Sequence, residues 1–386
     1  RATPSTNIVE KEVIFGGEER LSEQIASTLK VVDADLYAVI TGCMTDIIGD
    51  DVKAVVSDFQ KQGKPVIFAE TGGFKGSSAV GYDFIWDAII EQFVERGLPR
   101  NPRLVNILGL IPAQDVFWRG NLEELKRLLT AIGLEVNTFL SPFDQLPHLK
   151  KSSQAALNIV LSDIHGLKPA RLYEEIHGVP FVSEPLPIGP TATTGFLRRL
   201  AERFDLDRQR VETVIAAESA WYYRFINPLT DLFTDQDFQR FAVVIGNANY
   251  AYAATSFVAA DLGWIPYFAA VTDILSDGEK EKVLARFATL DPDLRPKVVF
   301  ETDTSQIQAR LQEELEKEND PYGTPISPAF VLGSNFDRPL AAAIKAGFWG
   351  ISYPITNRIV TDQGYVGFRG GLRLATEIVS VLVSNR

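Results

Sequence analysis

The chain has few residues that form cross-links or bind metals, since its 386 residues include one cysteine, one methionine and three histidines. A single cysteine excludes an intramolecular disulfide framework. The histidines, His148, His165 and His177, have none of the close spacings of a zinc site, so we expect each to be structural. No mononuclear metal centre is therefore predicted.

Long hydrophobic runs are absent as well. No uninterrupted apolar segment approaches the roughly 20 residues that a helix needs to cross a bilayer. Residues 1–12 are polar and lack the apolar core of a signal peptide. These absences predict a cytoplasmic protein.

Basic residues are outnumbered by acidic ones, and the formal net charge is −12. Because such a chain repels nucleic acid and anionic membranes, we expect neither as a main partner. Hydrophobic residues make up 46% of the chain, which is enough for a large core. The length is that of two or three domains.

Short β-branched segments recur along the chain, and each is followed by a turn and an amphipathic helical stretch. This alternation predicts an α/β fold of three Rossmann-like units, with mostly parallel sheets flanked by helices. Breaks at 97–103 and 233–237 give a first unit at 1–100, a second at 101–236 and a third at 237–386 with a C-terminal helix. The expected strands are 36–41, 66–70, 104–108, 135–139, 156–161, 241–245, 265–270, 297–301 and 329–332.

Other patterns mark helices, connections and core. Asn121 is expected to cap a helix that stops at Gly133, and 313–324 is expected to form a solvated connection after a helical first part. The aromatic side chains at 118 and 221–223 suit either the core or a subunit interface, and we favour the core. They are Trp118, Trp221, Tyr222 and Tyr223.

Cys43 stands directly after an apolar run and before a helical stretch. A helix N-terminus favours the thiolate form that binds iron, whereas the alternative is an inert buried thiol. The glycine-rich loop 71–78 follows the next strand, so the two loops are expected to meet at one sheet edge, although such glycines also serve in turns without a ligand. The loops 246–249 and 333–339 match no nucleotide-binding fingerprint.

Several segments together resemble the nitrogenase component 1 family along nearly the whole chain. Cys43 with Gly49-Asp50-Asp51 resembles a cluster-ligand cysteine of the family and the Gly-Asp-Asp that follows it. Phe74-Lys75-Gly76-Ser77-Ser78 resembles a β-type loop that carries a serine beside the P-cluster, and Ser77 is the matching position. The other similar segments are 13–21, 105–109, 119–126, 187–193, 354–358 and 365–372.

The resemblance implies a β-type subunit of a nitrogenase-like oxidoreductase. Such a subunit relays electrons through an iron-sulfur cluster, P-cluster-like or 4Fe-4S, at the interface with a homologous α-type subunit. An ATP-dependent iron-sulfur reductase protein delivers the electrons. By this resemblance Cys43 and Ser77 are the metal-binding residues, Gly42, Gly73 and Gly76 let backbone amides approach the cluster, and no residue performs acid-base catalysis.

Two departures from the family pattern limit these expectations. The central segment 161–165 has no cysteine where the α-type subunit holds its active-site cofactor, so this chain is not expected to hold that cofactor alone. The family also has cluster cysteines upstream of the segment at Phe15, and the fourteen residues before Phe15 contain none. An iron-sulfur cluster needs about four ligands. Either a partner supplies the missing ligands, or upstream residues that carried them were removed. If the chain was trimmed in this way, we expect it to be cluster-free.

Two other functions remain open at this stage. One is a cofactor-assembly scaffold that holds a maturing cluster, and the other is a cluster-free protein that binds a small ligand in a cleft between domains. The substrate, whether dinitrogen, a tetrapyrrole or another molecule, is left open. Lys75 either steers an anionic cluster or a partner carboxylate, or is solvated.

Overall fold

A computed structural model describes residues 3–235, 241–317 and 326–384. Its contacts divide the chain into two compact units. Unit 1 comprises Arg1–Arg100, Gln145–Gln154 and Lys168–Pro180. Unit 2 comprises Asn101–Asp144, Ala155–Leu167 and Phe181–Arg386.

Unit 1 contains a two-stranded parallel sheet of β1 (Tyr37–Ile40) and β2 (Val66–Ala69). Its small core includes Ile25, Val52 and Val56, which come from α2 and α4. The helices of unit 1 are α1 (Glu10–Phe15), α2 (Glu18–Val31), α3 (Cys43–Ile48), α4 (Val52–Lys61), η1 (Gly73–Lys75), α5 (Ser78–Gln92), α7 (Leu146–Lys150), η2 (Ser152–Gln154) and most of α8 (Leu167–His177).

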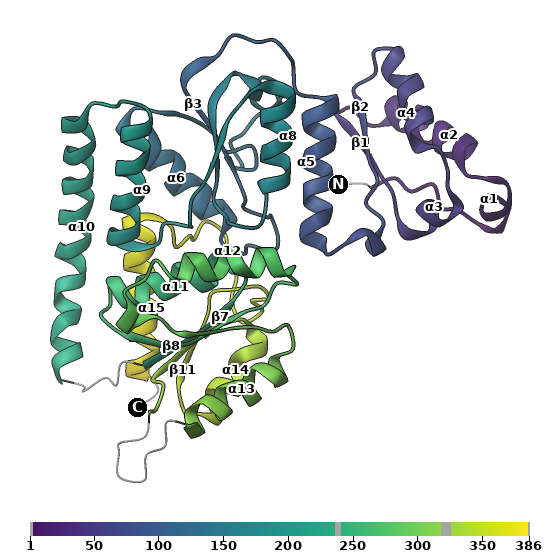
Figure 1. Cartoon of the computed structure of the whole chain (residues 1–386). Coiled ribbons are helices and arrows are strands. Elements are labelled where there is room, and N and C mark those ends of the chain that lie inside the picture. The colour runs from purple at the N-terminus through teal and green to yellow at the C-terminus, as the bar shows by residue number, and fades with distance from the viewer. Residues whose placement is uncertain (1–2, 236–240, 318–325, 385–386) are drawn as a thin grey trace. The chain divides into compact units, whose positions relative to one another are not determined.

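Unit 2 contains two parallel sheets (Figure 1). The first has the order β4-β3-β5-β6, and helix α6 (Trp118–Ile132) contacts β4 and α9 (Gly189–Arg203). Its strands are β3 (Asn101–Leu108), β4 (Glu135–Asn137), β5 (Ala155–Val160) and β6 (Phe181–Ser183).

The second sheet of unit 2 has the order β11-β10-β7-β8-β9. Its strands are β7 (Phe241–Gly246), β8 (Ile265–Val271), β9 (Lys297–Phe300), β10 (Phe330–Gly333) and β11 (Gly347–Gly350). The remaining helices are α10 (Arg208–Asp235), α11 (Ala248–Ala260), α12 (Asp277–Phe287), η3 (Pro292–Leu294), α13 (Thr304–Lys317), η4 (Asn335–Asp337), α14 (Arg338–Ala343) and α15 (Gly367–Ser384).

The predicted α/β fold with parallel sheets is confirmed, and each expected strand is present within a few residues of its predicted bounds. Strands β6 and β11 were not predicted. Each of the three predicted units, 1–100, 101–236 and 237–386, contains one sheet, but the contacts divide the chain into two compact units. The division into three units therefore stays a prediction. In the predicted break at 233–237, helix α10 continues to Asp235, and in the predicted connection at 313–324, helix α13 continues to Lys317. The remaining residues of both ranges lie outside the described residues.

Asn121 is not a helix cap, because α6 already begins at Trp118. Its side chain instead donates to the Tyr250 hydroxyl at 2.8 Å and to Asp115 at 3.3 Å, and it accepts from the backbone N–H of Tyr365 at 2.9 Å. The Tyr250 hydroxyl donates to Asp115 at 2.7 Å. Asn121 therefore joins three distant segments inside unit 2, while the predicted helix end at Gly133 is confirmed.

Candidate functional site

Cys43 is the first residue of α3, and two residues, Thr41 and Gly42, separate it from the end of β1. Gly42 is the N-cap residue and has extended backbone. The thiol side chain is exposed, so Cys43 is not a buried core thiol. An exposed sulfur at the end of a strand is available to a ligand or a partner.

The loops after β1 and β2 meet at one sheet edge, since these two strands are parallel neighbours. The backbone N–H of Gly73 donates to Cys43 Sγ at 3.1 Å. Beside this contact the Thr71 backbone N–H donates to Thr41 Oγ1 at 2.9 Å, and the Thr71 hydroxyl donates to the Thr41 carbonyl at 2.8 Å. These three hydrogen bonds fix one loop against the other.

Lys75 is exposed, and its ammonium group forms two ion pairs. Its ammonium group lies 2.9 Å from an Asp46 carboxylate oxygen and 2.8 Å from a Glu70 carboxylate oxygen. Burial opposes the charge on Asp46, but hydrogen bonds from Thr41 and Lys75 outweigh it and lower the pKa of Asp46. Hydrogen bonds to Glu70 and Asp46 raise the pKa of Lys75. The Lys75–Asp46 pair therefore connects the loop of Gly73 to the helix of Cys43, while the Lys75–Glu70 pair lies within that loop.

Glycines let the loops approach this closely. A Cβ at Gly73 would lie 3.2 Å from Cys43 Sγ, and one at Gly72 would lie 2.4 Å from Asp46 Oδ2. A Cβ at Gly76 would instead meet the side chain of Val80 at 2.9 Å, and one at Gly42 would meet no atom within 4 Å. Only Gly73, of the three predicted glycines, directly contacts the thiol.

Ser77 is the N-cap residue of α5 and is exposed, with no hydrogen bond from its side chain to the helix end. Among the described residues, Gly73 and not Ser77 is hydrogen-bonded to the Cys43 sulfur. Sequence reasoning did not select Gly72 and Asp46. The available signal was the spacing of Asp46, which follows Cys43 by three residues and so shares its helix face.

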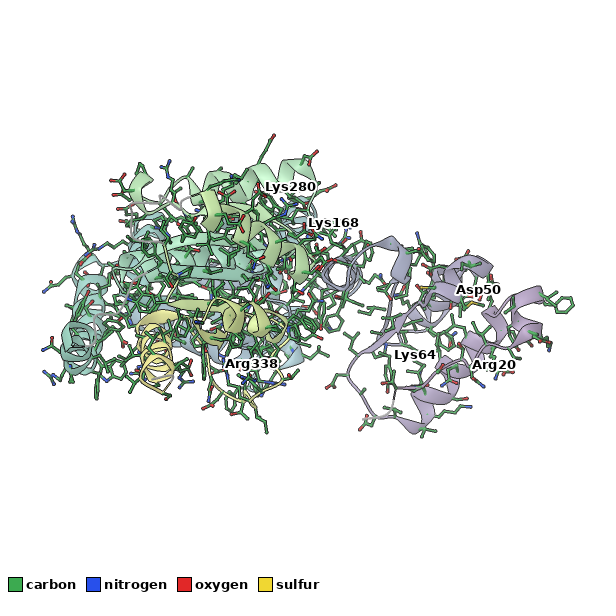
Figure 2. All side chains as sticks on the ribbon, turned by 90° about the horizontal axis from the view of Figure 1, so that it is seen from below. Arg20, Asp50, Lys64, Lys168, Lys280 and Arg338 are labelled. Carbon is green, nitrogen blue, oxygen red and sulfur yellow. The ribbon has the colours of Figure 1, made fainter. Side chains whose placement is uncertain are left out.

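Asp50 and Asp51 are structural residues. The Asp50 carboxylate, labelled in Figure 2, accepts the backbone N–H of Gly17 at 2.8 Å, which ties the start of α2 to the end of α3. Asp51 is the N-cap of α4 and accepts the N–H of Ala54 at 2.8 Å. The Gly-Asp-Asp segment therefore fixes the end of α3, the helix that begins at Cys43.

Large apolar side chains around Cys43 are exposed. Met44 and Ile47 of α3 have 53% and 71% of their surface accessible, and Phe74 beside Gly73 has 60%. Helix α1 packs against α3 and exposes Ile14 and Phe15. Such a surface is typical of a protein interface, because it is costly to leave in water.

The donor set fits a shared cluster better than a complete one. Cys43 supplies one exposed thiol with a backbone N–H donor beside it. In the part of the chain that the structure describes, no group of three or more His, Cys, Asp or Glu side chains could hold a metal ion. The remaining ligands of an iron-sulfur cluster would have to come from outside these residues.

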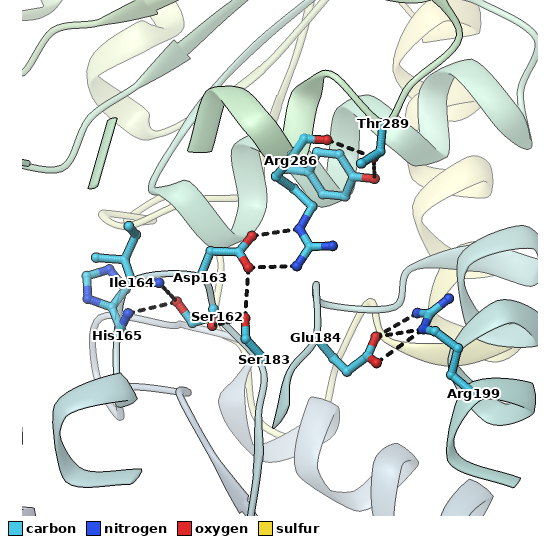
Figure 3. Close-up of polar contacts among 10 residues, drawn as sticks. Ser162, Asp163, Ile164, His165, Ser183, Glu184, Arg199, Arg286 and Thr289 are labelled. Atoms are coloured by element: carbon cyan, nitrogen blue, oxygen red, sulfur yellow. Dashed lines mark hydrogen bonds and ion pairs between the residues drawn. The ribbon is translucent and has the colours of Figure 1, made fainter. Parts of the chain in front are cut away.

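Side chains bridge the edges of the two sheets of unit 2, where doubly wound proteins bind ligands. Figure 3 shows the bidentate pair of Arg286 and Asp163, with both N–O distances at 2.7 Å. His165 Nε2 lies 3.2 Å from Asp273, and the Asn249 amide donates to the Gly109 carbonyl. His165 is thus paired with an acid of the facing loop.

No described helix is long and apolar enough to cross a membrane.

Comparison with known proteins gives a consistent result. The family profile described as nitrogenase component 1 type oxidoreductase matches residues 2–383. The nitrogenase molybdenum-iron protein beta chain of Sinorhizobium fredii (strain NBRC 101917 / NGR234) is 25% identical over 413 residues, which cover 98% of this chain and 74% of that protein.

A second relative has a different described role. The nitrogenase iron-molybdenum cofactor biosynthesis protein NifE of Nostoc sp. (strain PCC 7120 / SAG 25.82 / UTEX 2576) is 30% identical over 221 residues, which cover 56% of this chain and 45% of that protein. A solved structure of nitrogenase Cp1 at pH 6.5 has a TM-score of 0.77 at 20% identity and covers 98% of this chain and 82% of that one. That likeness shows a common fold.

Proposed function

Because the chain belongs to the family of nitrogenase component 1 type oxidoreductases, we propose that it is a β-type subunit that relays electrons through an iron-sulfur cluster. The cluster is shared with a homologous α-type subunit. One observation carries this proposal: Cys43 is an exposed thiol at an edge where two loops meet, and exposed apolar side chains surround it. This is half of an interfacial site.

The residues of this chain have separate roles in the proposed site. Cys43 would bind iron as a thiolate, and the Gly73 N–H, which donates to its sulfur, would favour the reduced state of a bound cluster. The Lys75–Asp46 ion pair holds the two loops together, and Glu70 binds Lys75 within its own loop. The cluster, when bound, accepts and releases single electrons. Ser77 and Gly76 remain proposed neighbours of the cluster.

The partners follow from the same surface. An α-type subunit covers Met44, Ile47 and Phe74 and supplies the missing ligands. The electrons come from an ATP-dependent iron-sulfur reductase protein. The substrate is reduced on the partner subunit, since the 161–165 segment of this chain offers a carboxylate and an imidazole that are already paired within the chain.

The test is the content of iron and acid-labile sulfide in the complex of this chain with its co-expressed homologous subunit, purified without oxygen. We expect stoichiometric iron in the wild type and a large loss in Cys43→Ala. Ser305→Ala, at an exposed site on α13, is the matched control and keeps the iron. Equal iron in Cys43→Ala and the wild type, or none in either, contradicts the proposal.

A cofactor-assembly scaffold is the second candidate, and the similarity to NifE supports it. Such a scaffold binds the cluster but transfers it to an acceptor apoprotein. Turnover of a reducible substrate by the loaded complex indicates the reductase, whereas transfer of iron and sulfide to an acceptor without turnover indicates the scaffold. A cleft-binding protein has less support, because the Arg286–Asp163 pair lies where its ligand would bind.

A further inference from the structure

Helix α10 presents a surface that has no part in the proposed electron relay. The helix packs against α6, α9 and α15 and lies at the edge of unit 2 (Figure 1). Val211, Ile215 and Tyr222 face the core and are buried. The opposite side carries exposed alanines, so it offers a partner a flat surface on which a backbone can approach closely. These residues are Ala216, Ala217 and Ala220.

Three large aromatic side chains flank these alanines. Trp221 is 36% exposed, while Tyr223 and Phe225 are exposed by more than half. The expectation that Trp221 and Tyr223 fill the core is therefore wrong, whereas Tyr222 is buried in the core and Trp118 packs against it. Aromatic side chains with arginine are enriched at the centres of protein interfaces and are costly to leave in water.

The charges of this surface are the reverse of the net charge of the chain. The Arg369 guanidinium lies 5.4 Å from the centre of the Trp221 ring and 3.9 Å from Glu218. Glu218 is already bound by Arg127 at 2.6 Å, so it adds little free negative charge. Arg224 and Arg373 are exposed, and neither forms an ion pair with any residue that the structure describes.

We propose that this surface, the α10 face, binds an acidic segment of a partner protein. Exposed aromatic rings supply the apolar contact, and the arginines select carboxylates and give a salt-dependent attraction. A second copy of the chain is a poor occupant, because two-fold pairing would oppose one positive face to another. The α10 face consists of Ala216, Ala217, Ala220, Trp221, Tyr223, Arg224, Phe225, Arg369 and Arg373.

Site-specific photo-crosslinking tests this proposal in the full chain, in the cells that naturally make it. The photoreactive residue p-benzoylphenylalanine replaces Ala217, and in a parallel strain it replaces Ile274, an exposed apolar residue elsewhere in unit 2. We expect Ala217 to give a cross-link to a peptide rich in Asp and Glu, identified by mass spectrometry. The position at Ile274 should not cross-link to that peptide.

Charge reversal gives the decisive comparison. Arg224→Glu should reduce the cross-link at least about tenfold, while Arg338→Glu, at an exposed arginine on α14 (Figure 2), should leave it unchanged. Tyr223→Ser should also weaken it, and the circular dichroism and melting temperature of each variant show whether it folds.

Several results would overturn the proposal. They are a cross-link to a second copy of the chain, to nucleic acid or to lipid, no cross-link from Ala217, or a cross-link that Arg224→Glu does not reduce. The iron content of the complex does not enter this test, so the α10 face and the electron relay can fail independently.

Discussion

At the scale of single residues, burial disfavours the charged form of two carboxyl groups. Burial raises the pKa of Asp115 and of Asp261 to about 6, although hydrogen bonds to each carboxylate act in the opposite direction. Asp261 Oδ1 accepts from the backbone N–H and the hydroxyl of Thr191, whereas Oδ2 has no partner among the described residues.

Asp261→Asn should make the stability of the protein less dependent on pH. The folded-state pKa lies above the ordinary value of 3.8, so the folded state binds this proton more tightly than the unfolded state does. The stabilising contribution is complete below about pH 4 and is lost as the pH rises through about 6. At pH 8 the variant should therefore be more stable than the wild type by about 1–3 kcal/mol.

Urea unfolding at pH 5 and pH 8 measures this difference. Asp205→Asn, at an exposed aspartate, is the control and should follow the wild type at both values. A variant that is less stable than the wild type at pH 8 would show that the carboxylate is stabilising in the folded protein.

Two buried tyrosines give a second contrast. The Tyr222 hydroxyl has no hydrogen-bond partner among the described residues, while the Tyr250 hydroxyl binds both Asp115 and Asn121. Tyr222→Phe should be neutral or stabilise by up to about 1 kcal/mol, and Tyr250→Phe should destabilise by about 1–3 kcal/mol. Equilibrium unfolding of the two variants checks the order, and equal losses would contradict this assignment of partners.

At the scale of elements, hydrophobic periodicity predicted β1–β5 and β7–β10 but not β6 and β11. Strand β6 has three residues, none of them fully buried. Strand β11 reads Gly-Phe-Trp-Gly, and its glycines resemble a turn in sequence. A Cβ at Gly347 would lie 2.8 Å from the Phe330 ring, so the close pairing of β11 with β10 depends on glycine at this position. This strand is therefore determined by its tertiary contact and not by the strand propensity of its residues.

At the candidate site the meeting of the two loops was predictable from the sequence, whereas the side-chain contacts between them were not. The order of strand, loop and helix predicted that the loops of Cys43 and Gly73 meet, because adjacent parallel strands end at one edge. The ion pairs of Lys75 could not be predicted, since they depend on the exact approach that Gly72 allows. No local pattern distinguishes a glycine beside a sulfur from a glycine in a turn.

Glycine substitutions in two helices should have opposite effects. A Cβ at Gly120 in α6 would lie 2.3–2.5 Å from backbone atoms of 362–363, so Gly120→Ala should destabilise by about 1–3 kcal/mol despite the better helix propensity of alanine. A Cβ at Gly278 in α12 would meet no atom within 4 Å, and Gly278→Ala should stabilise by up to about 1 kcal/mol. Denaturant midpoints measure both, and a stable Gly120→Ala would contradict the close approach.

At the scale of the whole molecule, the two units differ in the size of their cores. The apolar cluster around β1 and β2 in unit 1 contains Ile25, Val52, Val56 and Val66, and β1 leaves Ile40 exposed at its end. The central strand of the five-stranded sheet, β7, is buried along nearly all of its length. A small core on a two-stranded sheet is marginally stable alone.

Hydrogen exchange should show this difference. We expect the amides of β1 and β2 to exchange at least about 100-fold faster than those of β7, because local opening requires less free energy where fewer apolar groups are buried. The homologous subunit should slow exchange in α3 and in the turn at Gly73. Equal protection of β1 and β7 in the isolated chain would show that unit 1 needs no such partner for its stability.

The position of Asn121 has a consequence for how this sequence can change over generations. Its amide donates toward Asp115 and Tyr250 and accepts from the backbone at Tyr365, which is 244 positions away along the chain. Aspartate in its place would lose the donors, leucine would lose both functions, and glutamine would be one methylene too long. A substitution at this position therefore requires compensating substitutions at Asp115 and Tyr250. The three positions should covary among homologous sequences.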